Sequence, residues 1–157
     1  MNPARSTLND LFASSFARYL SVHPTGLRFP HGILCSSVEA TVHRCRPART
    51  WYRNRKPVCR SLDGITSIKE QNDCASCLDR KDCTAQIYLE LTIEDVPYRL
   101  LLAYTSARNF MQFASRIGKQ SLDLENTRIL ISVRDRGRWG ELCFIAKPAE
   151  HGAPPHK

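Results

Sequence analysis

The chain has 157 residues, of which 42% are hydrophobic, and its formal net charge is +8. This length fits one globular domain with a modest core, and no apolar run reaches the roughly 18 residues that a membrane-spanning helix requires. No apolar segment follows Met1–Arg5, so we expect no secretory signal, no membrane partner and a cytoplasmic, reducing location in which disulfides are rare.

The first segment, residues 1–23, is predicted to contain an amphipathic helix between residues 6 and 21. Thr7, with Asp10 three residues later, is typical of a helix start, and His23-Pro24 ends the pattern. This helix is expected to pack on the core, or to contact a second copy of the chain or a protein partner. Its apolar residues at helical spacing are Leu8, Leu11, Phe12, Phe16, Tyr19 and Leu20.

Residues 24–147 form the main predicted domain, and residues 148–157 a disordered tail. Alternating apolar and polar residues predict a β-rich fold, all-β or α+β. One short helix begins at Thr105 or Ser106, buries Phe110, Phe113 and Ile117, and stops at Gly118. The predicted strands cover residues 38–45, 84–94, 98–104, 128–134 and 138–146. Five strands with one helix between the third and fourth predict an OB-like barrel.

Basic residues gather in one stretch of the predicted domain. Residues 40–60 hold seven basic side chains and no acidic one, and a second cluster lies near residue 138. Aromatic residues interleave with both clusters, which favours a nucleic-acid surface over an ordinary solvated face. The candidate contacts are Arg46, Arg49, Trp51, Tyr52, Arg53, Arg55, Lys56, Tyr88, Arg136, Arg138 and Trp139. Tyr88 is included because the strand alternation directs it outward.

Four of the seven cysteines fall within residues 59–83, namely Cys59, Cys74, Cys77 and Cys83. A CxxC pair flanked by two more cysteines is typical of a structural zinc site. The less favoured alternatives are an iron–sulfur cluster, and free thiols or a redox pair. The surrounding residues are too polar to order themselves, so a metal gives a physical reason for order. We therefore predict a four-cysteine metal insert at 59–83.

The element order, together with these four cysteines ahead of Ile87-Tyr88-Leu89-Glu90-Leu91, resembles zinc-containing OB-fold proteins that bind single-stranded DNA. It is similar to the zinc-containing OB domain of the large subunit of replication protein A, and to single-strand-binding proteins of phages and mobile elements. The resemblance covers about residues 38–147. It implies a role in DNA replication or recombination. The tail is not acidic, unlike that of many bacterial single-strand-binding proteins, and the N-terminal helix is not part of a minimal OB-fold.

The sequence therefore predicts a non-enzymatic protein that binds single-stranded DNA, with RNA as an alternative ligand. Enzyme motifs for phosphate cradles, metalloproteases, esterases and zinc deaminases are absent from the sequence. The alternative function is a zinc-stabilised interaction adaptor or regulatory protein that does not bind nucleic acid. Its contact surface would be the metal insert and the N-terminal helix.

Overall fold

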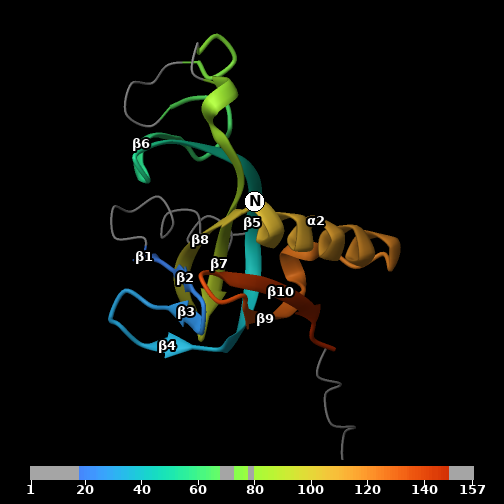
Figure 1. Cartoon of the computed structure of the whole chain (residues 1–157). Coiled ribbons are helices and arrows are strands. Elements are labelled where there is room, and N and C mark those ends of the chain that lie inside the picture. Colours follow the sequence, from blue (N-terminus) through green and yellow to red (C-terminus); the bar gives the residue numbers. More distant parts are fainter. Residues whose placement is uncertain (1–17, 68–72, 78–79, 149–157) are drawn as a thin grey trace, which may run out of the picture.

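The computed structural model describes residues 18–67, 73–77 and 80–148, and in this part of the chain the fold is mostly β with one α-helix (Figure 1). The strands are β1 (Arg18–Tyr19), β2 (Ser21–His23), β3 (Gly26–Arg28), β4 (Leu34–Cys35), β5 (Ser37–Arg53), β6 (Lys56–Ser61), β7 (Thr84–Ile93), β8 (Val96–Ala103), β9 (Arg128–Asp135) and β10 (Gly140–Ala146). Helix α2 (Tyr104–Lys119) follows β8, and the short 3-10 turns η1 (Arg80–Asp82) and η2 (Leu124–Asn126) complete the elements.

The long strand β5 organises the main sheet, whose order is β1-β8-β7-β5-β9-β10. Its first residues pair with β9, its middle and later part with β7, and its last residues also with β6. A bulge at His43 shifts the register with β7 between Val42 and Arg44. Because a bulge bends a strand, β5 can serve two parts of the sheet. A separate small sheet has the order β2-β3-β4.

The core is formed by the main sheet together with α2, which packs mainly on β10, and with Leu27 and Phe29 in and after β3 (Figure 1). Phe110 and Phe113 on α2 meet Phe144 on β10, with ring centroids 5.2 and 6.1 Å apart. The apolar side of β7 and the first inward residues of β5, Val38 and Val42, complete this layer. The predicted apolar faces of the helix and of the first strand are therefore confirmed.

The β-rich fold and the helix between the third and fourth of the five long predicted strands are confirmed, but the closed barrel is wrong. Within the described residues β10 pairs only with β9, and the outer edge of β8 is taken by β1. The sheet therefore stays open. No helix in the described part of the chain is long and apolar enough to cross a bilayer.

The predicted N-terminal helix lies mostly outside the described residues, as does the predicted tail apart from residue 148. Where the helix prediction overlaps the described chain it is wrong, because residues 18–19 and 21–23 are strands. Arg18–Tyr19 runs parallel to β8, and the amide of Leu20 donates to the Arg99 carbonyl over 2.9 Å. Strand pairing replaces the helical spacing here, with the distant strand β8 for residues 18–19 and with the neighbouring strand β3 for residues 21–23.

Gly140 marks a close approach between β10 and the small sheet. A Cβ added there would overlap the His23 carbonyl oxygen and lie 2.8 Å from Val133 Cγ1. Gly140→Ala is expected to destabilise the fold by about 1–3 kcal/mol in urea unfolding, since backbone must move. The matched control is Gly118→Ala on α2, where an added Cβ meets nothing within 4 Å. Equal stability of the two variants would contradict this packing.

Candidate nucleic-acid interface

The β5–β6 hairpin presents the exposed part of the basic run. Arg53 pairs with Lys56 across the two-residue turn Asn54-Arg55, whose φ angles are 51° and 63°. These left-handed angles suit the tight turns that match the twist of a β-hairpin. Arg53, Arg55 and Lys56 are exposed, and no carboxylate among the described residues pairs with them. The hairpin tip therefore carries three uncompensated cations.

Aromatic side chains accompany these cations on the same hairpin. The Arg53 guanidinium lies over the Trp51 ring, 4.9 Å from its centroid, which fixes the ring beside the tip. Trp51 is half-buried and Tyr52 is 40% exposed. Arg49, another predicted contact, is half-buried at the base of the hairpin. The structure thus brings six of the predicted contacts together, since Arg49, Trp51, Tyr52, Arg53, Arg55 and Lys56 share this hairpin.

The second face of β7 is a polar layer, and it corrects the predicted placement of Tyr88. Tyr88 is only 2% exposed, and its hydroxyl donates to Glu90 Oε1 over 3.1 Å. Burial, and then the charge of Glu90, raise the pKa of Tyr88. A ring enclosed in this way has no open face for a base. We therefore do not count it as a stacking residue.

Arg46 also belongs to this layer rather than to the hairpin tip. Its Nη2 lies 3.5 Å from Glu90 Oε1, and its guanidinium lies 5.8 Å from the Tyr88 ring centroid. Arg44 Nε approaches the other oxygen of Glu90 at 3.6 Å. One buried carboxylate, 4% exposed, therefore faces two guanidinium groups, and this part of the sheet retains positive charge.

Two separate sets of side-chain hydrogen bonds lie along this same face, one at the hairpin and one at the start of α2. Gln86 Nε2 donates to the Tyr52 hydroxyl over 3.4 Å, and the Thr50 hydroxyl donates to Gln86 Oε1. Thr50 lies opposite Thr84, whose hydroxyl is 3.5 Å from that of Tyr104. Tyr52 and Tyr104, both exposed, therefore each hydrogen-bond to a side chain of β7, the strand that lies between β5 and β8.

Tyr104 was missed by the sequence analysis, which placed it at the end of a buried strand. It is 77% exposed, and its φ of 47° turns the chain from β8 into α2. With Trp139, which is 46% exposed, it lines a cavity of about 560 Å³ that also contacts Leu101 and Ala103. The available signal was its position directly before the predicted helix start at Thr105.

In the second predicted basic cluster some arginines pair with a carboxylate and one does not. Arg136 Nε donates to Glu141 Oε2 over 2.6 Å, and Arg134 approaches the same oxygen at 3.9 Å. Asn109 on α2 donates to the other oxygen of Glu141 over 3.0 Å, and these two hydrogen bonds lower the pKa of Glu141. Glu141 on β10 thus links Arg136 in the β9–β10 turn to Asn109 on α2. Arg138 is exposed, with no carboxylate partner among the described residues.

The predicted metal insert is wrong. Cys59, Cys74, Cys77 and Cys83 all lie within the described residues, and none of them forms a disulfide there. The described residues contain no group of three or more His, Cys, Asp or Glu side chains that could hold a metal ion, so neither the zinc nor the iron–sulfur prediction stands. Burial raises the pKa of the Cys83 thiol, and the other three cysteines add to the effect. They are near enough to influence its charge without forming a ligand set.

Carboxylate–backbone hydrogen bonds organise the described parts of this segment instead. Asp63 Oδ1 accepts from the amides of Ile65 and Thr66 at 2.8 Å each, which lowers the pKa of Asp63. Asp73 Oδ1 accepts from the Ala75 amide over 2.9 Å, and the Cys74 amide donates to the Ile65 carbonyl over 2.6 Å. Such aspartate-centred turns satisfy a polar backbone locally. They supply the order that the sequence analysis assigned to a metal.

Comparisons with protein-family models, with curated proteins and with solved structures find no match for this chain.

Proposed function

We propose that this chain binds single-stranded nucleic acid, with single-stranded DNA as the favoured ligand, and that it is not an enzyme. The observation that carries the proposal is the hairpin tip, where Arg53, Arg55 and Lys56 are exposed without a carboxylate partner among the described residues. In a folded protein, unpaired cations beside aromatic rings suit phosphates beside base faces. Exposed Tyr52 and half-buried Trp51 supply those rings.

In the proposed mechanism the single-stranded nucleic acid passes from the β5–β6 hairpin across the end of the main sheet to the β9–β10 turn. The guanidinium groups of Arg53 and Arg55 donate to phosphate oxygens, and the rigid guanidinium fork suits two of them at once. Bases stack on Tyr52, Tyr104 and Trp139, each stack contributing about 1–3 kcal/mol. The bound nucleic acid crosses the end of β5 and β7 between Tyr52, which bonds to Gln86, and Tyr104, which bonds to Thr84.

The order of elements supports this path. We propose that β5, β7, β8, α2, β9 and β10 form an open variant of the OB arrangement. OB-folds bind oligonucleotides on the second and third strands and on the loops after the first and fourth strands. In this chain those loops correspond to the β5–β6 hairpin and to the β9–β10 turn with Trp139. Phage or mobile-element replication or recombination is the proposed setting.

The adaptor alternative loses one of its two surfaces. It relied on a metal insert, which the described residues do not form, and on an N-terminal helix that lies mostly outside them. An adaptor without nucleic-acid binding would be insensitive to oligonucleotide. The two functions are therefore separated by one titration.

Intrinsic fluorescence gives that titration, because Trp51 and Trp139 are the only tryptophans in the chain and both belong to the proposed interface. Oligo-dT is expected to quench the emission, with an affinity that falls steeply with salt and exceeds that for duplex competitor. Trp139→Ala is expected to weaken binding about 5- to 150-fold, the equivalent of one stack.

The matched control for this substitution is Ile145→Ala on β10, an apolar position that is 58% exposed against 46% for Trp139. It is expected to leave the affinity unchanged. Absence of quenching and of binding at low salt would reject the proposed function.

A further inference from the structure

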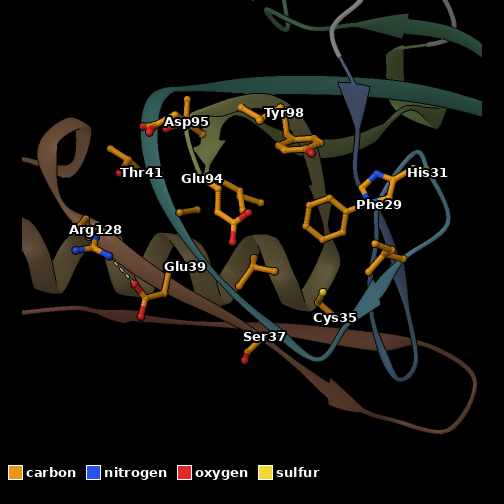
Figure 2. A pocket seen from close by; sticks show the side chains of 16 residues that line it. Phe29, His31, Cys35, Ser37, Glu39, Thr41, Glu94, Asp95, Tyr98 and Arg128 are labelled. Atoms are coloured by element: carbon orange, nitrogen blue, oxygen red, sulfur yellow. Dashed lines mark hydrogen bonds and ion pairs between the residues drawn. The ribbon is translucent and has the colours of Figure 1, made fainter.

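A second surface lies at the other end of β5, in a cleft of about 830 Å³ between the small sheet and the open main sheet (Figure 2). Its floor is apolar and belongs to the core, with Val38 on β5, Tyr98 on β8 and Phe29 after β3. Phe29 and Tyr98 meet edge to face with centroids 5.2 Å apart. The cleft exists because the sheet does not close over these residues.

The rim of the cleft is acidic. Glu39 is compensated, since its oxygens lie 2.7 Å from Arg128 and 3.1 Å from Lys147. Glu94 and Asp95, in the β7–β8 turn, have no cation partner among the described residues. Figure 2 shows Glu94 extending into the space between Tyr98 and Glu39. In a chain of net charge +8, Glu94 and Asp95 therefore add two negative charges that no described cation pairs with, and the three carboxylates against two cations leave this rim with a net charge of −1.

The complementary surface of the same chain is the hairpin tip, with three uncompensated cations. The cleft is lined by Ser37–Thr41 at the start of β5, whereas Arg53 ends that strand. Seventeen residues of extended chain span roughly 50 Å, at about 3.3 Å per residue. The two surfaces stand at opposite ends of one strand, so within one folded chain they do not meet. Two copies can bring them together.

We propose that the cleft receives the β5–β6 hairpin of a second copy, so that copies associate head to tail. Glu94 and Asp95 would pair with Arg55 and Lys56 of the incoming hairpin. The aliphatic stems of these long side chains would cover the apolar floor. Because the two contacting surfaces differ, the association does not close at two copies but continues into chains or rings.

The same cations are assigned to nucleic acid in the proposed function, so the two contacts compete. Oligonucleotide is therefore expected to dissociate the assembly, provided that the proposed function also holds. The self-association itself does not depend on that function. It follows from the charges and the separation of the two surfaces alone.

Sedimentation velocity over a range of protein concentrations at low salt tests the proposal. The wild-type chain is expected to form species larger than a dimer as concentration rises, and to return to monomer at high salt. Glu94→Gln with Asp95→Asn removes the acidic rim and keeps residues of similar size, with asparagine tolerant of the φ of 63° at position 95. Arg55→Gln with Lys56→Gln removes the cations. Each double variant alone is expected to associate at least tenfold more weakly.

Mixing the two double variants gives the decisive result. One retains the hairpin and the other retains the cleft, so the mixture is expected to form a dimer that does not extend further. A wild-type chain that stays monomeric at low salt, a rim variant that associates like wild type, or a mixture that stays monomeric would each overturn the proposal.

The test of self-association can be read separately from the test of nucleic-acid binding. The rim variant keeps its hairpin, so its oligonucleotide binding is expected to match or exceed that of the wild type. A chain that associates but does not bind oligonucleotide rejects the proposed function alone. A chain that binds oligonucleotide as a strict monomer rejects the head-to-tail contact alone.

Discussion

Replacing Arg53, Arg55 and Lys56 together with alanine is expected to reduce the slope of log affinity against log salt by about 2, because each lost phosphate contact on a single strand removes about 0.7. At about 0.1 M salt this corresponds to a loss of affinity on the order of 100-fold. These three side chains are exposed at the hairpin tip, and no carboxylate in the described part of the chain competes for them. The measurement is a set of oligo-dT titrations at several salt concentrations.

The chain offers a control of equal charge. Arg108, Arg116 and Lys119 are exposed on α2, outside the proposed path of the strand. Their triple alanine variant removes the same net charge and is expected to keep both affinity and salt slope close to wild type. If the two triple variants lost affinity equally, binding would depend on overall charge and the hairpin would have no special role.

Replacing Glu90 with glutamine is expected to lower the free energy of unfolding by about 1–3 kcal/mol. Loss of one partner from a fully buried ion pair costs about 3–5 kcal/mol, and we reduce this value because Arg44 and Arg46 are 40% and 34% exposed. Glutamine at position 90 can still accept the hydrogen bond from the Tyr88 hydroxyl, so the substitution removes only the negative charge. The measurement is urea unfolding of Glu90→Gln, Tyr88→Phe and the double variant, since a double-mutant cycle separates the coupled terms.

Glu39 provides the comparison for this experiment. It also lies between two cations, Arg128 and Lys147, but its side chain is 42% exposed. Glu39→Gln is expected to change stability much less than Glu90→Gln, because solvent screens an exposed pair. A larger effect at Glu39 would contradict the view that the polar layer on β7 holds the sheet together.

The arginines of the basic run differ in their contacts within the folded chain. Arg46 pairs with buried Glu90, whereas Arg55 has no carboxylate partner among the described residues. The sequence pattern puts both in one set, because a run of basic residues does not show which of them meets a carboxylate 44 residues later. The structure places Arg46 beside Glu90 in the sheet, and we propose that exposed Arg55 contacts the nucleic acid.

Local periodicity predicted much of the fold correctly. The alternation in residues 84–94 predicted β7, and the spacing of Phe110, Phe113 and Ile117 predicted the buried face of α2. The same alternation predicted that Tyr88 and Glu90 face solvent, but both side chains are buried in the structure. Alternation shows which residues share a face. It does not show what covers that face.

Two further differences have a similar cause. Residues 18–23 carried the end of a helical pattern and form strands, because pairing with β8 and β3 satisfies their backbone. The cysteine spacing predicted a metal, whereas Asp63 and Asp73 bind the local amides and the thiols do not converge. Spacing along the chain is necessary for a metal site, but the ligands must also meet in space.

Composition and short-range periodicity are enough to predict the β-rich class, the position of the helix and the concentration of cations between residues 40 and 60. Three features appear only in the folded chain: the sheet stays open, Tyr104 and Trp139 line one cavity, and the acidic cleft and the basic hairpin stand at opposite ends of β5. These features depend on strand pairing between distant residues. The free energy of that pairing comes from contacts that no local stretch of sequence contains.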